Sequence, residues 1–285
     1  MVRLDGGVFE MGSVSFYAEE GPVHVETVAP FEIDDAAVTN REFAEFVAAT
    51  GYVTTAERPL DSADFSDALL ESLDPGSLVF VPTSGPVDLR DWRQWWHWQV
   101  GADWRHPFGP DTGIDGKDDH PVVQVAFADA TAFAEWAGKR LPTEVEWEFA
   151  ARGGLDGRTY VWGEEPNDGF RANTWQGRFP YLNTGANGWV GTAPVRSFPA
   201  NGFGLYEMTG NTWEWTSTVW TDNHPVLSPC GCSPQLSSDQ AVRVTKGGSH
   251  LCSPEYCLRY RPAARSRQTV DSSTTHLGFR CVRSL

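Results

Sequence analysis

Two cysteines near the end of the sequence, Cys252 and Cys257, are the residues whose type and spacing best suit chemistry. A spacing of five places two side chains on opposite faces of a strand, and about 140° apart on a helix, so only a turn could bring both sulfur atoms to one point. The intervening segment Ser253-Pro254-Glu255 has the composition of a turn. A dithiol site is therefore compatible with this stretch.

The surroundings of the two cysteines are basic, although the whole chain is acidic. Between Gly247 and Leu285 there are six arginines and two acidic residues, whereas the formal net charge of the chain is −16. Neighbouring guanidinium groups favour a thiolate over a thiol. The pair is predicted to be reactive or to bind a soft metal, but the spacing alone fits a structural disulfide or two unrelated core cysteines equally well.

Length and composition predict one large domain over residues 1–285, built from many short elements. The chain contains 13 Trp, 28 Gly and 19 Pro. Gly and Pro interrupt regular structure, whereas each Trp buries a large area. We expect long ordered loops pinned by aromatic side chains.

Charge and hydropathy exclude several classes of protein. No apolar run of about 18 residues occurs and the first residues lack a signal-peptide core, which predicts a soluble cytoplasmic protein with no membrane partner. A reducing compartment makes a structural disulfide less favoured. The acidic balance argues against nucleic acid as a partner, because phosphate binding needs a basic surface.

The first part of the chain shows ordinary core-building patterns. Short strands are expected over residues 6–12 and 24–28. A helix should follow Thr39, because Thr39 and Glu42 have the spacing of a capping box.

Two further helices are expected in the middle of the chain. One should run from Asp129 through Gly138 and bury Phe133 and Trp136. The other should cover residues 144–152, with Thr143 opening a second capping box.

Residues 60–120 show little periodicity and contain a cluster of tryptophans. The mixed spacing favours packing inside an irregular loop, although a peptide-binding groove would use the same residue type. The five members are Trp92, Trp95, Trp96, Trp98 and Trp104.

Two loops carry oxygen ligands of the kinds that calcium accepts. Residues 207–214 offer two carboxylates and several carbonyls, and residues 173–174 with 183–189 offer amides and carbonyls. Neither stretch fits the EF-hand loop, so solvated polar loops remain the simpler interpretation. No HExxH array or glycine-rich phosphate loop is present, and no Ser-His-Asp hydrolase is indicated.

Six motifs, in order along nearly the whole chain, resemble the formylglycine-generating enzyme (sulfatase-modifying factor) family, prokaryotic type. They are Gly7-Val8-Phe9-Glu10-Met11-Gly12, Val38-Thr39-Asn40, the run from Trp136 to Glu148, Asn201-Gly202-Phe203-Gly204-Leu205, Gly210-Asn211-Thr212-Trp213-Glu214-Trp215 and Leu277-Gly278-Phe279-Arg280-Cys281. The resemblance implies an α+β fold with little regular secondary structure, the formylglycine-generating-enzyme or C-type-lectin-like fold.

The resemblance also implies an activity. Enzymes of this family use O2 to oxidise the cysteine of a Cys-x-Pro-x-Arg segment in a sulfatase to Cα-formylglycine, with a Cu(I) ion held by two cysteines. Cys252 and Cys257 stand at both positions, and Ser249, Trp213 and Tyr256 match residues that line the family's active-site pocket. The implied partners are an unfolded sulfatase polypeptide, O2 and a thiol reductant.

Two calcium sites are implied by the same resemblance. The first would use Asn173, the Thr174 carbonyl, Asn187 and the Trp189 carbonyl, and the second Glu207, the Gly210 and Thr212 carbonyls and Glu214. The animal enzymes have a carboxylate at the position of Asn187 and an amide at that of Glu207. The first site should therefore be weaker, and the second stronger.

Other positions follow from the resemblance with less detail. The peptide is expected in a groove near Trp95 and Trp96, with its arginine held by Asp61. The animal enzymes' structural disulfides are not carried over, because their partner positions are Ala134, Ala151 and Pro262. Cys281 is left unpaired, and Cys230 and Cys232 are open to interpretation as surface thiols or a secondary metal site.

Two other functions compete with the oxidase. A relative of the iron-dependent thiohistidine sulfoxide synthase would need a multi-histidine iron site, and the seven His of this chain show no such cluster. A non-catalytic lectin-like binding module would not depend on Cys252 or Cys257.

Overall fold

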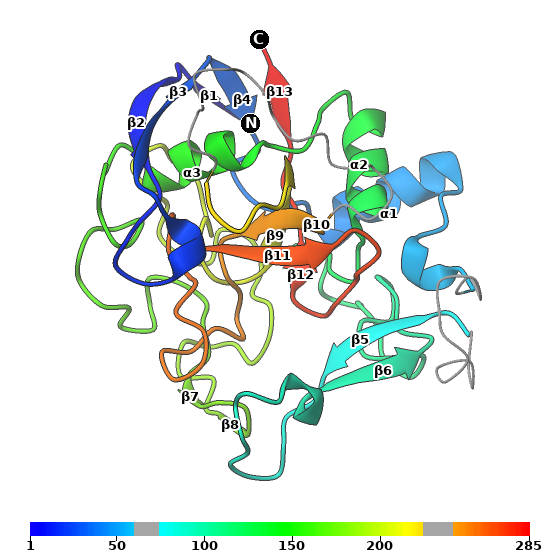
Figure 1. Cartoon of the computed structure of the whole chain (residues 1–285). Coiled ribbons are helices and arrows are strands. Elements are labelled where there is room, and N and C mark those ends of the chain that lie inside the picture. Colours follow the sequence, from blue (N-terminus) through cyan, green and yellow to red (C-terminus); the bar gives the residue numbers. More distant parts are fainter. Residues whose placement is uncertain (60–73, 225–241) are drawn as a thin grey trace.

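The computed structural model describes residues 1–59, 74–224 and 242–285 (Figure 1). Asp61, Cys230 and Cys232 lie outside these ranges. No helix within the described residues is both long enough and apolar enough to cross a membrane.

A four-stranded sheet forms the centre of the fold, with the strand order β11-β10-β9-β12. β12 runs parallel to β9, and the other neighbours are antiparallel. Its members are β9 (Trp213–Val219), β10 (Val242–Lys246), β11 (Arg265–Thr269) and β12 (Leu277–Gly278). β11 therefore lies at one edge of the sheet.

A second sheet joins both ends of the chain around β4, because β1 and β13 each pair antiparallel with that strand. Its members are β1 (Val2–Leu4), β4 (Phe31–Ile33) and β13 (Val282–Ser284). Three hairpins complete the strands: β2 (Gly7–Met11) with β3 (His24–Val28), β5 (Gly76–Phe80) with β6 (Trp96–Val100), and β7 (Gly177–Arg178) with β8 (Leu182–Asn183).

Three α-helices and three short 3-10 helices are described. The α-helices are α1 (Asn40–Thr50), α2 (Phe127–Trp136) and α3 (Glu144–Arg152), and the 3-10 helices are η1 (Ala18–Glu20), η2 (Thr55–Glu57) and η5 (Trp92–Gln94). The capping boxes expected at Thr39 and Thr143 are both present. The expectation of little regular secondary structure is confirmed.

The second helix differs from its predicted form. It begins at Phe127, two residues before Asp129, because the Asp129 carboxylate reaches back and accepts a hydrogen bond from the Ala126 N–H at 2.8 Å. Phe133 is buried as expected, but Trp136 is 44% exposed, so its predicted burial is wrong.

The tryptophan cluster is not the uniform loop that its spacing suggested. Trp96 and Trp98 belong to β6, which pairs with β5. Trp95 and Trp104 are buried, whereas Trp92 and Trp98 are exposed. The cluster therefore divides between core packing and surface.

Five buried charged side chains from α3, β10 and β11 form a network that we call the buried ion network: Glu144, Glu148, Arg152, Lys246 and Arg265. Glu148 pairs with Arg152 at 2.6 Å and with Lys246 at 3.0 Å. Glu144 pairs with Arg265 at 2.8 Å. The network fixes α3 against β10 and β11, because breaking any pair would leave a buried charge without a partner.

Candidate active site

The loop of residues 247–264, between β10 and β11, carries both cysteines (Figure 1). The predicted turn is confirmed, since the Ser253 carbonyl accepts hydrogen bonds from the N–H groups of Tyr256 at 3.0 Å and Cys257 at 2.7 Å. The turn brings the two sulfur atoms to 3.1 Å, and both cysteines are free thiols. The spacing of five therefore does produce a dithiol pair.

The two thiols differ in their protonation. Burial raises the pKa of the Cys252 thiol well above its ordinary value, and the contact with Cys257 raises it further. The hydrogen bond from Cys252 lowers the pKa of the Cys257 thiol, and Arg259 lowers that pKa as well. Cys257 is therefore the thiol that ionises first, with Cys252 as its hydrogen-bond donor. The Ser249 N–H donates to the Cys252 sulfur at 3.3 Å.

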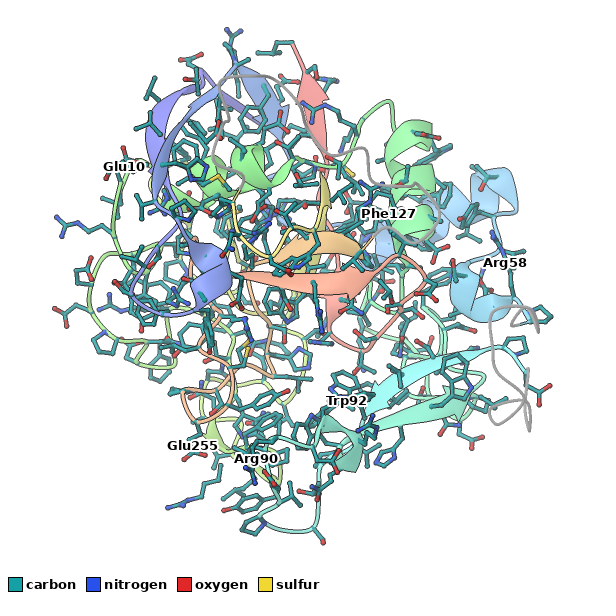
Figure 2. The ribbon with its side chains drawn as sticks, viewed as in Figure 1. Glu10, Arg58, Arg90, Trp92, Phe127 and Glu255 are labelled. Carbon is teal, nitrogen blue, oxygen red and sulfur yellow. The ribbon has the colours of Figure 1, made fainter. Side chains whose placement is uncertain are left out.

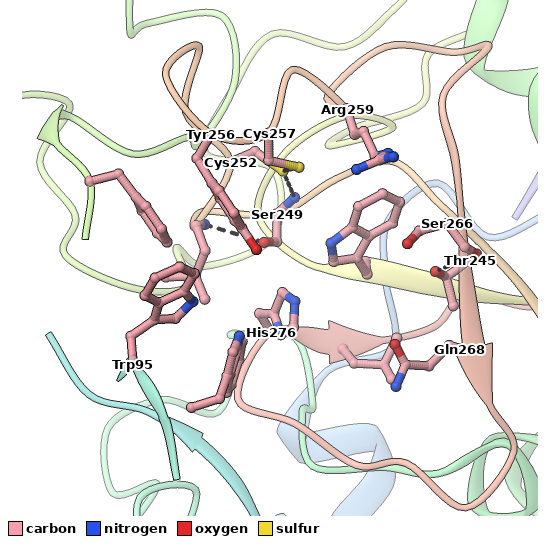
Figure 3. Close-up of a pocket in the computed structure, with 15 residues that line it drawn as sticks. Trp95, Thr245, Ser249, Cys252, Tyr256, Cys257, Arg259, Ser266, Gln268 and His276 are labelled. Carbon is pink, nitrogen blue, oxygen red and sulfur yellow. Dashed lines mark hydrogen bonds between the residues drawn. The ribbon is translucent and has the colours of Figure 1, made fainter. Parts of the chain in front are cut away.

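A cavity of about 200 Å³ opens beside the sulfur atoms, and we call it the dithiol cavity (Figure 3). All the site residues predicted near the cysteines line it: Ser249, Trp213, Tyr256, Trp95 and Trp96. Trp213 begins β9, Trp96 begins β6, and Trp95 directly precedes β6. The fold thus brings together residues that lie up to about 160 positions apart in the sequence.

One end of the dithiol cavity is aromatic. The ring of Tyr256 lies 5.3 Å from Trp95 and stacks on Phe179 at 4.6 Å, measured between ring centroids. In Figure 2, Glu255 of the loop that carries the cysteines and Trp92 of η5 lie at the same end of the molecule. Burial raises the pKa of Tyr256 to about 12, so its hydroxyl remains a hydrogen-bond donor at neutral pH.

The other end of the dithiol cavity is polar and belongs to β10 and β11. Thr245, Ser266 and Gln268 line it, together with Arg259 and His276 (Figure 3). Burial lowers the pKa of His276 to about 3, so the imidazole is neutral. Sequence reasoning counted Arg259 among the arginines near the cysteines and did not single out the other four residues. Alternation of Ser266 and Gln268 along a strand was the available signal, but polar alternation at this spacing is equally typical of a solvated strand.

Several polar groups at the dithiol cavity have no hydrogen-bond partner among the described residues. The Trp95 indole N–H is buried without an acceptor. The hydroxyl of Tyr256 and the amide of Gln268 also lack a partner within the described ranges. A buried donor without an acceptor is costly, and this applies to the Trp95 indole N–H. Tyr256 is 38% exposed and Gln268 is partly exposed, so their polar groups are open to water or to a ligand.

The first predicted calcium loop contains neutral groups that bind each other. The Asn187 amide donates to the Asn173 side-chain oxygen at 3.2 Å, and the Asn173 amide donates to the Gly191 carbonyl at 2.8 Å. Thr174 is buried, and the Trp189 N–H donates to Asn187 at 3.1 Å. These residues lie together, but they bring no carboxylate.

The second predicted calcium loop has two carboxylates with different partners. Glu214 is held by Arg280 at 2.7 Å and by the Trp147 indole N–H at 2.7 Å. Glu207 accepts hydrogen bonds from the backbone N–H groups of Arg196 and Phe198, and no described cation forms an ion pair with it. Burial raises the pKa of Glu207. Glu207 therefore fits a cation ligand better than Glu214 does.

The Gly210 and Thr212 positions of this loop are also buried or closely packed. A side chain at Gly210 would approach the Asn173 carbonyl to 2.5 Å, so the two predicted calcium loops contact each other. The Gly210 N–H donates to the Gly247 carbonyl at 2.8 Å, and Thr212 is 2% exposed. The predicted metal loops thus also support the start of the cysteine loop.

Fold and site together define a loop-rich α+β protein that holds a buried dithiol beside a cavity. The family model described as "Sulfatase-modifying factor enzyme 1-like domain" matches residues 1–285, and the chain belongs to this family. The chain is similar to the formylglycine-generating enzyme of Mycobacterium tuberculosis, with 59% identity over 99% of this chain and 97% of the relative.

Two other comparisons define the limits of that similarity. The chain is 40% identical, over 99% of its length and 87% of the relative, to an "Inactive C-alpha-formylglycine-generating enzyme 2" of Bos taurus. Family membership alone therefore does not decide activity. The structure of PvdO from Pseudomonas aeruginosa superposes with a TM-score of 0.67 at 25% identity, covering 99% of this chain and 93% of that one, which supports the predicted fold.

Proposed function

We propose that this protein is a copper-dependent oxidase that converts the cysteine of a Cys-x-Pro-x-Arg motif in sulfatases to Cα-formylglycine with O2. The name of the 59%-identical relative supports the reaction class. One observation carries the proposal, namely the pair of free, buried thiols 3.1 Å apart at the dithiol cavity.

The thiol pair fits Cu(I). Soft thiolate ligands favour Cu(I), whereas a structural zinc site would require four ligands. Among the described residues, no group of three or more His, Cys, Asp or Glu side chains is arranged to hold a metal. Cys252 and Cys257 would therefore hold the ion by themselves, leaving the dithiol cavity to the substrate cysteine. Bound copper would supply the one-electron chemistry that lets O2 react with a thiolate.

The residues of the chain have separate roles in this proposal. In the metal-free pair Cys257 is the more acidic thiol and Cys252 holds its proton, so Cys257 would bind the ion first and Cys252 would release its proton to become the second thiolate ligand. Tyr256 and Trp95 offer unshared donors to the peptide from the aromatic end. The stacked rings of Tyr256 and Phe179 form the aromatic wall of that end. Ser249 and Trp213 line the cavity wall beside the sulfur atoms.

Electron balance requires a reductant. Converting a thiol to an aldehyde with release of hydrogen sulfide removes two electrons from the substrate, whereas reducing O2 to water consumes four. Two further electrons must therefore come from elsewhere, and oxidation of two small thiols to one disulfide supplies them. Every oxygen atom is then accounted for, one in the aldehyde and one in water.

The substrate is proposed to be an unfolded sulfatase segment, met in the cytoplasm. A cysteine within a folded core could not enter a cavity of about 200 Å³. The peptide would lie past Trp95 and Trp96, both of which line the cavity. Asp61, proposed to bind the peptide's arginine, lies outside the described residues.

Calcium is proposed as a structural cofactor at the loop of residues 207–214. The buried carboxylate of Glu207, with its raised pKa, is the observation that supports this. Calcium prefers oxygen ligands, and a cation would compensate the buried charge.

The proposal is tested by mass spectrometry of a Cys-x-Pro-x-Arg peptide incubated with the protein, copper, a thiol reductant and air. The expected product is the aldehyde, identified by its mass and by reaction with hydroxylamine. Replacing the substrate cysteine with serine should abolish the product, because a hydroxyl is a poor Cu(I) ligand. Conversion of the serine peptide, or conversion without copper, would contradict the mechanism.

A further inference from the structure

β11 is an edge strand that borders the dithiol cavity. In the four-stranded sheet it pairs only with β10, so the other side of its backbone has no strand partner among the described residues. Ser266 and Gln268 of this strand line the cavity (Figure 3). Exposed strand edges bind extended peptides through main-chain hydrogen bonds.

A second cavity, of about 350 Å³, continues from the first along the same strand. Its lining comprises Ala18, Glu19, Trp220, Asp222, Arg259, Ser266 and Arg267. Arg259 and Ser266 line both cavities. The two cavities therefore adjoin at these residues, and a peptide that lies along β11 with its cysteine at the sulfur atoms would extend toward the second cavity.

The charges of the second cavity are not all compensated. Arg259 is paired with Glu19 at 2.6 Å and lies 4.0 Å from the ring of Tyr17. The Asp222 carboxylate accepts a hydrogen bond from the Trp220 indole at 3.2 Å but has no ion pair within the described residues, so a preference for Lys would assign the subsite to Asp222 instead of Arg267. The exposed guanidinium of Arg267 has neither an ion pair nor a hydrogen bond within the described residues.

We propose that the second cavity is a substrate subsite beyond the Cys-x-Pro-x-Arg motif, and that Arg267 selects an acidic residue there. The inference rests on the proposed function, because it takes the substrate to be an extended polypeptide. The flanking residues lie along β11, and their acidic side chain pairs with Arg267. Only one flank of the motif reaches this subsite, since the second cavity lies to one side of the cysteines.

The test uses peptides that contain the motif alone, or the motif extended by four residues on either flank with one Asp or one Lys. Conversion by the copper-loaded protein gives kcat/KM for each peptide. Fluorescence polarisation gives the affinity of the same labelled peptides for the protein without added copper. On one flank only, the Asp peptide should exceed the Lys peptide by about threefold to tenfold, and added salt should shrink that difference.

Arg267→Glu is the informative variant, and Thr269→Glu on the same exposed strand edge is the control, since Thr269 lines neither cavity. Arg267→Glu should reverse the preference to Lys and leave the unextended peptide unchanged. Thr269→Glu should keep the preference for Asp. Three outcomes would overturn the inference. The Asp-to-Lys ratio could be the same in both variants, or the preference could occur on both flanks or on neither. Arg267→Glu could also change conversion of the unextended peptide as much as that of the extended ones.

The two readouts separate this inference from the proposed function. If the protein converts no peptide, with or without copper, the proposed oxidase is rejected. The affinities measured by fluorescence polarisation would still show whether the subsite prefers an acidic residue. Conversion of the unextended peptide without any flank preference would reject the subsite alone.

Discussion

The dithiol cavity and the buried ion network use opposite faces of the same two strands. Thr245 faces the cavity and the adjacent Lys246 faces the network, and Ser266 and Arg265 of β11 divide in the same way. In the network, each charged side chain lies within 3.7 Å of an opposite charge. At the cavity, donors such as the Trp95 indole N–H lack acceptors among the described residues. Charged groups that lie beside an opposite charge can hold a fold together, whereas a donor without an acceptor at a cavity suits contact with a ligand.

The largest expected effect comes from removing either thiol. Cys252→Ala or Cys257→Ala should abolish peptide conversion and tight Cu(I) binding, because one thiolate cannot hold the ion alone. Both thiols are buried, so either variant should also lose some stability through lost packing, while remaining folded because the buried ion network is intact. Copper titration and mass spectrometry of the product measure both effects.

Cys281→Ala is the control for the thiol variants, since Cys281 is also fully buried but does not line the cavity. It should cost some stability through the lost packing and leave turnover per folded molecule unchanged. Turnover retained by Cys257→Ala would contradict the copper assignment.

The next largest effect should come from a substitution in the buried ion network, on the opposite face of β10 and β11. Glu148→Gln removes the carboxylate between Arg152 and Lys246, leaving two buried cations. We expect a loss of about 3–5 kcal/mol in the free energy of unfolding, with turnover of the folded fraction little changed. Urea unfolding measures the loss. Glu32→Gln, which breaks the surface pair with Arg283, should cost less than about 1 kcal/mol.

Lowering the pH should weaken the contribution of the buried ion network to stability. Lys246 and Arg152 lower the pKa of Glu148 to about 2 against the opposing effect of burial, compared with an ordinary value of 4.5. A carboxyl whose folded-state pKa is depressed stabilises the fold above the ordinary pKa, and this contribution disappears as pH falls from about 4.5 to about 2. The stability difference between the native protein and Glu148→Gln should therefore shrink over that range by up to about 3 kcal/mol.

A constant stability difference between pH 5 and pH 2.5 would show that Glu148 is not the titrating group. Buried histidines such as His224 and His276, whose pKa values are lowered to about 3, also destabilise the fold in acid. His276 does so equally in both proteins, whereas the Glu148 carboxylate raises the pKa of His224, so the comparison reports Glu148 together with its effect on His224.

Glu207 is buried like the residues of the buried ion network but, unlike them, has no ion pair with a described cation. Calcium should raise the melting temperature of the native protein by about 5 °C, by mass action on the folded state. Glu207→Gln should lose this response and, under chelation, be at least as stable as the native protein. Glu214→Gln should be destabilised with or without calcium, since it leaves Arg280 unpaired. Equal responses of the native protein and Glu207→Gln would reject the calcium ligand.

The smallest effect should come from one hydroxyl. Tyr256→Phe keeps the stacking on Phe179 and removes a hydroxyl that has no partner among the described residues. We expect kcat/KM to fall about threefold to tenfold, with the melting temperature unchanged within about 1 °C. A melting temperature lowered by several degrees would assign the hydroxyl to the fold instead of the substrate.

Local chemistry explains which features could be predicted from the sequence. The capping boxes at Thr39 and Thr143 and the turn over Ser253–Glu255 depend on neighbours within a few residues, and all three occur. The predicted start of α2 was wrong. Ala126, just before the helix, has no side chain that accepts a hydrogen bond, so Asp129, the third residue of the helix, supplies the acceptor.

Contacts between distant segments could not be predicted in this way. Trp95 and Trp98 are three residues apart, but one is fully buried against Phe179 and the other is exposed. The partner of Glu214 was unknown until β9 and the segment after β12 were placed together, which brings Arg280 to its carboxylate. The resemblance to the family supplied the cysteine pocket residues, whereas the β11 side of the cavity required the sheet topology.

The base of the cysteine loop has a consequence for its dynamics. Lys246 and Arg265 are opposite each other in the β10–β11 ladder, and both approach Glu144, so the eighteen residues 247–264 leave and re-enter the sheet at one point. Amide hydrogens of such a base exchange with solvent only through global unfolding, whereas those at the tip exchange through local fluctuations. We therefore expect the amide hydrogens of Glu255 and Tyr256 to exchange faster than those of Lys246 and Arg265, a difference that hydrogen exchange measures.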